Sequence, residues 1–453
     1  MPASEPSPRR SPVTRWLDRR GTHTRDLLSG ASVAFAAKVV GAGAGFALSV
    51  LVAQLLGAEG TGDFFLALGM LSVVATVGRF GLDQAVVRFV AAEASEDAWG
   101  RVRSVAQTSI KVAGGLLLLC ALSLGLGAEW LATVVFGREE LAPVFRAVAW
   151  GVVPMGLAWV YAALLRGRRD IAASQTVQAV LSQLIALPLL WGLHATGRLT
   201  VEHAVLAYAV ATGGTLLAGV LWWHRAMPSE AASRFPAREL LSTSAPLFGV
   251  ALMGILTQWL PVLLLGALAT SAETGVFAIA MRVVSLAGLV LMAINVMAAP
   301  QFAALYHQGD GTELSSLVRQ TSLYTTVLAI PILIALLAMP RFVLGLFGES
   351  FVVGVPVLRI LAIGYTVNLV TGAVGTLLVM SGRERAMQSV TLFSTGLLAT
   401  GCVVLIPPYG MLGAAIAVSA ALAVQNSIAA WWVWRTFRIN PLFFLPTPTP
   451  RLD

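Results

Sequence analysis

The stretch VAFAAKVVGAGAGFALSVLVAQLLG, residues 33–57, decides the class of fold. Its apolar run is long enough to cross the hydrocarbon core of a membrane as a helix, which takes about 20 residues. One lysine, Lys38, interrupts the run. A charge near the bilayer centre costs roughly 2.5–3.5 kcal/mol on insertion scales, so such a residue is expected to face a partner or a water-filled cavity. The segment therefore predicts a membrane helix that faces a polar partner or a water-filled cavity at Lys38.

The composition of the whole chain also indicates a membrane protein. Of its 453 residues, 57% are hydrophobic and only 11% are charged, and the mean hydropathy is +0.81. A soluble domain has about 25% charged residues. Cys120 and Cys402 lie far apart within apolar runs and are expected to be packing residues. The basic residues are scattered over many loops, so no nucleic-acid partner is expected. The first apolar run has the length of a full span, so we do not expect a cleaved signal peptide.

Twelve apolar runs are long enough to span a membrane, and they are too long and too uniformly apolar for the strands of a barrel. Since only helices and closed barrels satisfy their backbone within lipid, the sequence predicts an all-α integral membrane protein. The twelve predicted spans are residues 29–56, 62–87, 104–127, 141–165, 171–195, 202–224, 240–266, 274–299, 317–339, 352–380, 386–406 and 410–434.

The Lys and Arg residues of the connections predict the orientation, because positive loops stay in the cytoplasm. Twenty-one of the 30 Lys and Arg residues fall on one side of the predicted topology, and only Arg138, Arg198 and Arg341 fall on the other. Both termini are therefore expected in the cytoplasm. The remaining six cations lie inside predicted spans: Lys38, Arg79, Lys111, Arg146, Arg282 and Arg359.

An internal repeat divides the chain into two halves. Thr61, Gly62 and Phe64 match Thr274, Gly275 and Phe277, and each pair is separated by 275 − 62 = 213 residues. Arg146 and Arg359 have the same separation. Two six-helix bundles that both start from the cytoplasm are related by a pseudo-twofold axis along the membrane normal. The predicted parts are a disordered basic cytoplasmic tail (1–25), an N-terminal lobe (26–224), a cytoplasmic linker (225–239), a C-terminal lobe (240–435) and a cytoplasmic tail (436–453).

The sequence lacks the patterns that enzymes of the common metal and nucleotide classes carry. There is no P-loop, no His-Glu-x-x-His and no paired Cys-x-x-Cys, and no connection is long enough for a catalytic domain. We therefore expect neither an enzyme nor a bound metal or cofactor. The GAGAG stretch, residues 41–45, has no strand before it, so it is expected to be a small-residue surface for close helix packing.

The depth of each buried cation suggests its role. Three cations close to predicted helix ends are expected to anchor at the membrane interface: Lys111, Arg146 and Arg359. Lys38, Arg79 and Arg282 lie deeper and are expected to line an aqueous chamber that binds an anion, for which the planar fork of arginine is well suited. Asp83 follows Arg79 by one helical turn and is either an ion-pair partner or an ion-coupling site. Only Asp63 and Asp83 are carboxylates placed well inside spans, so the inner charge balance is positive.

Residues 55–91, LLGAEGTGDFFLALGMLSVVATVGRFGLDQAVVRFVA, resemble the first helices of the polysaccharide flippases, the O-antigen and exopolysaccharide (Wzx-like) transporters of the MOP superfamily, whose fold is MATE-like. The length, the twelve spans and the two repeated bundles agree with the resemblance over nearly the whole chain. The positions that match the pattern of these flippases are Leu56, Gly57, Gly62, Phe64, Gly81, Leu82, Ala85 and Arg88.

The resemblance implies transport of an undecaprenyl-pyrophosphate-linked oligosaccharide from the inner to the outer leaflet by alternating access. This would serve surface polysaccharide and lipopolysaccharide synthesis at the bacterial inner membrane. Lys38, Arg79 and Arg282 would then contact the substrate. The implied partners are the lipid-linked oligosaccharide, membrane lipids, and a polysaccharide polymerase with its chain-length partner.

Two related functions stay open at this point. A cation-coupled multidrug exporter of the same fold needs carboxylates in its cavity, but the first span has none and the seventh has only Glu239 at its cytoplasmic start. A lipid II flippase usually has two further helices after the twelfth, where this chain has only a short tail. A membrane glycosyltransferase should have a sizeable outer loop with catalytic residues, and none is predicted.

Overall fold

The computed structural model describes residues 12–228, 230–231 and 235–444, with side chains described from residue 34 onward. Within these ranges every regular element is a helix. The elements are α1 (Pro12–Arg79), α2 (Leu82–Ser95), α3 (Trp99–Trp130), η1 (Leu131–Val135), α4 (Leu141–Gly167), α5 (Ile171–Gln175), η2 (Thr176–Val180), α6 (Leu181–Ala195), α7 (Val201–Ala226), α8 (Ala237–Leu268), α9 (Ser271–Gln308), α10 (Gly311–Ala338), α11 (Pro340–Gly345), η3 (Glu349–Gly354), α12 (Val355–Thr371), α13 (Val374–Met380) and α14 (Glu384–Phe437).

Ten helical stretches of the described chain are long and apolar enough to cross a membrane. Two of them, α1 and α14, each consist of two helices joined at a kink, at Gly57 (φ 66°) and Gly410 (φ 53°). These backbone conformations are left-handed and favour glycine, which lacks the Cβ that would clash. If each kinked helix is counted as two, the segments correspond to the twelve predicted spans. The number twelve thus depends on dividing α1 and α14 at these glycines.

The ends of the chain extend beyond the predicted spans. The structure has α1 helical from Pro12, within the tail predicted as residues 1–25, and residues 1–11 lie outside the described residues. The character and cytoplasmic location of that tail stay predictions. At the other end α14 stops at Phe437, and residues 445–453 lie outside the described chain.

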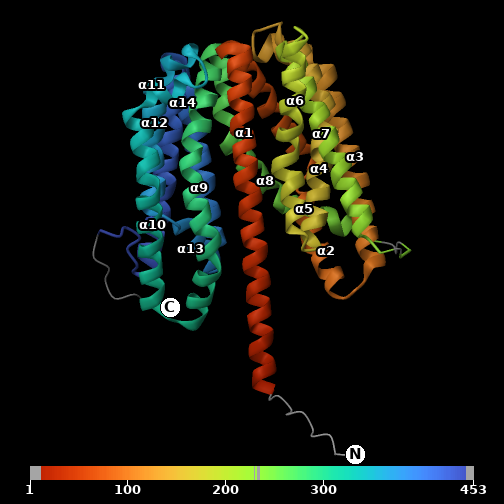
Figure 1. Ribbon diagram of the computed structural model, residues 1–453, viewed down its shortest axis with the longest axis vertical. Coiled ribbons are helices and arrows are strands. Elements are labelled where there is room, and N and C mark those ends of the chain that lie inside the picture. Colours follow the sequence, from red (N-terminus) through yellow and green to blue (C-terminus); the bar gives the residue numbers. More distant parts are fainter. Residues whose placement is uncertain (1–11, 229, 232–234, 445–453) are drawn as a thin grey trace, which may run out of the picture.

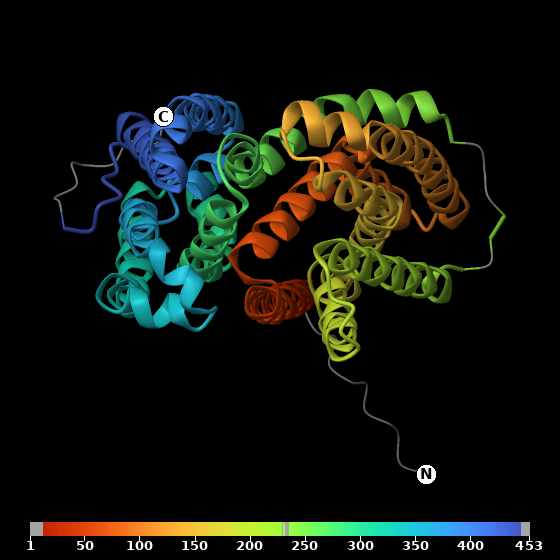
Figure 2. The same cartoon turned by 90° about the horizontal axis from the view of Figure 1, so that it is seen from above.

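The helices form two groups that lie side by side (Figures 1 and 2). In Figure 1 the helices α2–α7 form the group on the right and α9–α14 the group on the left, with α1 and α8 between them. The groups meet at the top of this view and diverge toward the bottom. These groups correspond to the two predicted lobes, and the fold of the described residues is all-α.

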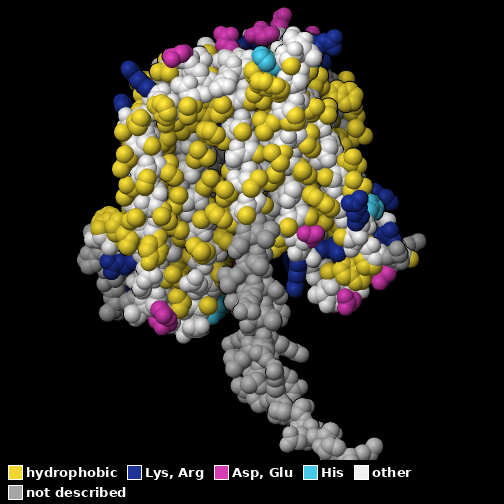
Figure 3. Space-filling view, viewed as in Figure 1, with side chains coloured by type: hydrophobic (Ala, Val, Ile, Leu, Met, Phe, Trp, Pro, Cys, Tyr) yellow, Lys and Arg dark blue, Asp and Glu magenta, His cyan; other side chains and the backbone are white. Residues whose placement is uncertain are grey.

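On the face seen in Figure 3, apolar side chains cover the middle of both lobes, and the charged side chains gather toward the upper and lower edges. On α3, for example, Leu119 and Leu126 expose 61% and 87% of their surface. Apolar side chains exposed in this way across the middle of both lobes indicate a surface that faces lipid. The cations expected at the membrane interface are likewise exposed: Lys111, Arg146 and Arg359.

The two repeats contact each other through equivalent residues on α1 and α9. A Cβ on Gly62 would collide with the carbonyl oxygen of Ser271, and a Cβ on Gly275 would collide with the carbonyl oxygen of Ala58. Ala58 and Ser271 are also 271 − 58 = 213 residues apart. A reciprocal contact between equivalent residues is what a twofold axis produces. Small residues one turn apart let the two backbones approach closely, as in many membrane helix pairs.

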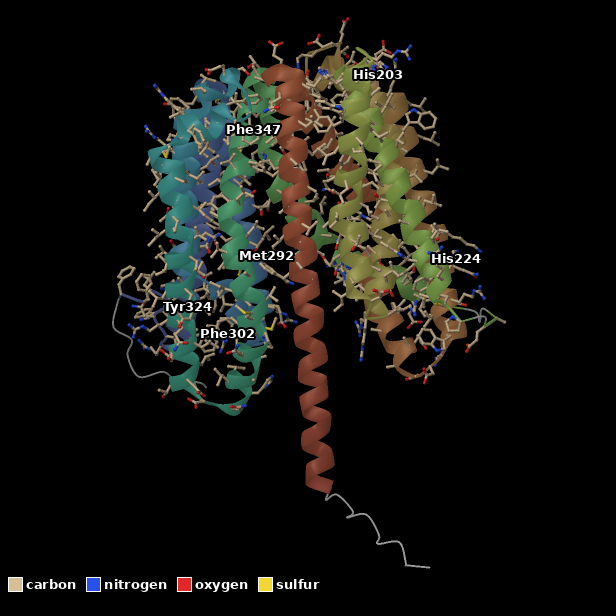
Figure 4. All side chains as sticks on the ribbon, viewed as in Figure 1. His203, His224, Met292, Phe302, Tyr324 and Phe347 are labelled. Atoms are coloured by element: carbon tan, nitrogen blue, oxygen red, sulfur yellow. The ribbon has the colours of Figure 1, made fainter. Side chains whose placement is uncertain are left out.

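Polar and aromatic contacts close the same end of the molecule. Arg138 donates to Asp63 at 2.9 Å, and both side chains hydrogen-bond to Ser271, which belongs to the other lobe. Phe46 of α1 packs edge-on against Phe347 of the C-terminal lobe with ring centroids 5.4 Å apart, near the upper end of Figure 4. Because Arg138 was assigned to the non-cytoplasmic side, we call this the outer end. The lobes are therefore joined at the outer end. Toward the other end α9–α14 diverge from α2–α7 (Figure 1), while α8 stays packed on the N-terminal lobe, with the rings of Phe80 and Phe248 stacked 4.9 Å apart.

The GAGAG stretch lies in the first half of α1 and packs closely on the N-terminal lobe. A Cβ on Gly41 would lie 2.5 Å from the backbone oxygen of Ala179 in η2, and one on Gly45 would lie 4.0 Å from Gln183. The predicted role of this stretch in close helix packing is therefore confirmed. The contact fixes the first half of α1 against the N-terminal lobe, beside the space between the two lobes.

Candidate substrate-binding chamber

Two cavities meet between the lobes, and we call them together the chamber. The C-lobe cavity, of about 400 Å³, lies among α8, α9, α12 and α14. The N-lobe cavity, of about 160 Å³, lies among α1, α4, η2, α6, α7 and α8. Gln258, Trp259 and Arg282 line both cavities, so these three residues mark the boundary between them. The chamber thus draws its walls from both repeats.

Arg282 is positioned by the regular helix α9. This helix begins with a capping box, in which the Thr270 side chain accepts from the Glu273 backbone and the Glu273 side chain accepts from the Thr270 backbone. Arg282 follows the start of the helix at Ser271 by eleven residues, which is about 16 Å along the axis. The outer contact around Gly275 therefore fixes the depth at which Arg282 enters the chamber.

The protein does little to neutralise the positive charge of the Arg282 guanidinium. It lies over the Phe65 ring, 5.6 Å from the centroid. Among the side chains that the structure describes, none is within ion-pair or hydrogen-bond distance of this guanidinium. Aromatic faces attract cations, but much less strongly than a carboxylate does. A partly buried cation inside a membrane protein with no carboxylate partner is available for an anionic ligand.

The chamber contains no carboxylate. All residues that line the two cavities are neutral except Arg282, and their polar groups are Gln, Ser, Thr, Tyr and Trp side chains. The charge of the lining is therefore +1. This sign agrees with the predicted anion-binding chamber, and it differs from a cavity that would attract organic cations.

Arg79 is buried in a network of its own instead of lining either cavity. Its guanidinium donates to Asp83 at 2.8 Å, to the Thr76 hydroxyl at 2.8 Å and to the Ala75 carbonyl at 3.2 Å. It also stacks 4.3 Å from the centroid of Trp159, whose indole does line the N-lobe cavity. Of the two roles considered for Asp83, the structure places it in an ion pair. Arg79 therefore contacts the lining residue Trp159 from the side that faces away from the cavity.

Lys38 is exposed on α1 and is not among the residues that line the two cavities. In the described part of the chain it has neither an ion pair nor a hydrogen bond. The three cations predicted to act together are therefore in three different environments, and only Arg282 lies at the chamber. A contact between Lys38 and substrate stays a prediction.

The neutral chamber residues were not identified from the sequence. Trp159, Tyr208, Gln258 and Trp259 lie in apolar spans, where tryptophan and tyrosine are common and carry no distinguishing pattern. The glutamines within the spans were the one sequence feature that could have indicated these residues, because an amide inside a membrane is costly unless it has polar partners. Four glutamines inside spans line the chamber: Gln178, Gln183, Gln258 and Gln425.

The fold and the chamber together define a two-lobed membrane protein whose inner chamber carries a positive charge. The chain belongs to the polysaccharide biosynthesis protein family, whose model matches residues 27–306. It is 24% identical over 420 residues to a protein named probable low-salt glycan biosynthesis flippase Agl15 of Haloferax volcanii, covering 90% of this chain and 84% of the relative. The predicted membership of a polysaccharide family is therefore confirmed.

Two solved structures show the same fold. The lipid II flippase MurJ in an inward closed conformation has a TM-score of 0.73 with 11% identity, covering 92% of this chain and 89% of that chain. An inward-facing multidrug resistance MATE family transporter has a TM-score of 0.68 with 16% identity, covering 89% and 97%. At these identities the likeness concerns the fold, so the substrate has to be inferred from the chamber.

Proposed function

We propose that the protein moves an undecaprenyl-pyrophosphate-linked oligosaccharide from the inner to the outer leaflet of a bacterial cytoplasmic membrane. Its family and the name of the Haloferax relative support a flippase for glycan precursors. The distribution of Lys and Arg over the loops supports cytoplasmic termini, with the separated ends of the lobes toward the cytoplasm. A polymerase and a chain-length protein stay predicted partners, to which we assign no residue.

The single observation that carries this proposal is the environment of Arg282. This guanidinium lies where the two cavities meet, without a carboxylate near it and with no carboxylate in the lining. The planar fork of arginine binds phosphate oxygens in pairs, and such bonds are strongest where water is excluded. The pyrophosphate of the lipid carrier supplies the matching negative charge.

Transport then needs no covalent chemistry. The pyrophosphate enters from the cytoplasmic end and binds Arg282, while the polyprenyl chain stays in the bilayer. The outer contact around Gly62 and Gly275 opens as the cytoplasmic ends of the lobes approach each other, in the manner of rocking-bundle transporters. Lys38, exposed on the first half of α1, contacts the substrate on its way in. A multidrug exporter of cations is disfavoured because the chamber offers no carboxylate to bind them.

Flipping by Arg282 variants tests the proposal. Purified protein in vesicles would be given an undecaprenyl-pyrophosphate-linked oligosaccharide, and the fraction reached by an external lectin would be followed over time. Arg282→Gln keeps polar atoms but removes the charge, and we expect flipping to fall at least tenfold. Arg282→Lys keeps the positive charge but loses the planar guanidinium that binds two phosphate oxygens at once, so it should retain intermediate activity.

The matched control is Arg359→Gln. Arg359 is exposed, lies on α12 of the same lobe as Arg282, and does not line the chamber. It should flip at the wild-type rate. The proposal is wrong if Arg282→Gln folds with the wild-type melting temperature and flips normally. It is also wrong if a deletion strain keeps its surface polysaccharide and becomes sensitive to cationic drugs.

A further inference from the structure

We propose that the N-lobe cavity is a subsite for one uncharged sugar ring, the sugar attached directly to the pyrophosphate. This inference rests on the proposed function, because it takes Arg282 as the position of the phosphate. Arg282 lines the N-lobe cavity as well as the C-lobe cavity. A group bonded to a phosphate at Arg282 therefore has the N-lobe cavity directly beside it.

Two tryptophans contribute indole rings to this cavity. Trp159 comes from α4 of the N-terminal lobe, and Trp259 comes from α8 of the C-terminal lobe. An indole offers a broad apolar face with an N–H at its edge. The C–H face of a pyranose ring packs on such a surface, and the hydroxyls at its rim remain free for hydrogen bonds. Because the two indoles belong to different lobes, a sugar held between them would contact both halves of the transporter.

Neutral polar side chains surround the indoles. Gln178, Gln183 and Gln258 line the cavity and bring carboxamide groups that both donate and accept hydrogen bonds. Tyr208, Thr212 and Thr215 of α7 add hydroxyl groups. Such groups match sugar hydroxyls, which also donate and accept. A purely anionic or purely cationic ligand would leave half of these bonds unused.

Two arginines, the buried Arg79 and the half-buried Arg166, contact two of the residues that line the cavity. Arg79, bonded to Asp83, stacks on Trp159 at 4.3 Å. Arg166 donates to the Gln178 side-chain oxygen at 2.7 Å, so the amide nitrogen of Gln178 remains available as a donor. Neither Arg79 nor Arg166 lines the cavity. We therefore assign both arginines as positioning residues of the sugar subsite.

The charges explain why the sugar should be neutral. Arg282 is the one cation among the lining residues of both cavities, and in the proposed function the pyrophosphate occupies it. A uronic acid in the N-lobe cavity would add a carboxylate to the negative charge of the pyrophosphate, and no further cation lines the cavity to neutralise it. Burying an unpaired carboxylate is strongly unfavourable. The subsite should therefore discriminate against an acidic sugar at the position next to the phosphate.

Equilibrium binding to the purified full-length protein tests the subsite with three probes. They are undecaprenyl pyrophosphate, undecaprenyl-pyrophosphoryl-glucose and undecaprenyl-pyrophosphoryl-glucuronic acid. We expect glucose to tighten binding at least tenfold over the bare lipid and glucuronic acid to give no such gain. Trp159→Leu should remove the gain from glucose, so that this variant binds the glucose lipid no more tightly than the bare lipid, whereas Arg282→Gln should weaken all three probes.

Trp150→Leu is the matched control, since Trp150 lies on the same helix α4 with 76% of its surface exposed. It should bind all three probes like the wild type. Trp159→Phe keeps an aromatic face and should keep part of the gain, which guards against misfolding of the leucine variant. Equal binding of the bare lipid and the glucose lipid, with Trp159→Leu having no effect, would overturn the subsite. Failure to bind even the bare lipid would instead overturn the proposed function.

Discussion

Replacing Gly275 by alanine should weaken the contact that joins the outer ends of the lobes. The new methyl group would lie 2.8 Å from the backbone nitrogen of Gly62 and closer still to the carbonyl oxygen of Ala58. Both atoms belong to the backbone of α1, so no side-chain rotation can relieve the collision. The helices α1 and α9 have to move apart, and the closed outer end loses stability relative to the open one.

The size of the effect follows from the cost of overpacking. A methylene forced into a well-packed contact costs about 1–3 kcal/mol. If the whole cost acts on the closed outer end, the ratio of closed to open molecules falls about 5- to 150-fold. Alanine also favours a helix over glycine by up to about 1 kcal/mol. The measured effect must therefore be compared with a Gly→Ala change that meets no neighbour.

Distances between the lobes can be measured with spin labels. Cysteines at Glu139 and Ser350, both exposed on outer turns of different lobes, would carry the labels. The native Cys120 and Cys402 would first be replaced by alanine. In Gly275→Ala the distance distribution should shift toward longer values, and the same shift is expected for the reciprocal variant Gly62→Ala.

Gly43→Ala serves as the control, because a Cβ on Gly43 of α1 would meet no atom within 4 Å. It should leave the distances unchanged. The reasoning would be refuted if Gly275→Ala had the wild-type distance distribution and melting temperature. It would also be refuted if Gly43→Ala produced an equal shift, since the effect would then come from helix propensity and not from the collision.

Two further predictions concern the charged residues. Arg79→Met should lower the free energy of unfolding by about 3–5 kcal/mol because it leaves Asp83 without its partner, and the double variant with Asp83→Leu should recover much of that loss in thermal unfolding. Binding of undecaprenyl-pyrophosphoryl-glucose should be constant from about pH 6 to pH 8, because arginine stays protonated and the lining has no Asp, Glu or His. A titration of binding with a midpoint in this interval would show that a group outside the described lining controls the site.

Much of the architecture was predictable because it depends on properties that are local in the sequence. The length of an apolar run decides whether a helix can span the bilayer, and the cations beside it decide its orientation. The repeat was also visible, since Gly62 and Gly275 occupy equivalent positions at which only a residue without a side chain fits. The kinks at Gly57 and Gly410 lie at connections that the predicted spans already implied.

The roles of the buried cations were predicted only in part. Depth along the helix predicted two groups, but Lys38 is exposed like Lys111, Arg146 and Arg359, and only Arg79 and Arg282 are shielded. Depth does not tell which way a side chain points around the helix axis. The structure places Arg79 in a network with Asp83, Thr76 and Trp159, and it places Arg282 at the chamber. The pairing of Arg79 with Asp83 was one of the two alternatives that the spacing allowed.

Hydrophobic length, charge and repetition are properties of each segment, so the amino-acid sequence was enough to predict an all-helical, two-lobed membrane protein with an excess of inner positive charge. The folded chain was needed to show that equivalent glycines meet at the outer end and that Trp159, Gln178, Gln258 and Trp259 gather beside Arg282. Those residues come from helices α4, η2, α8 and α9, which belong to both halves of the chain. How each helix is rotated against its neighbours depends on the packing of the whole bundle, which no single segment encodes.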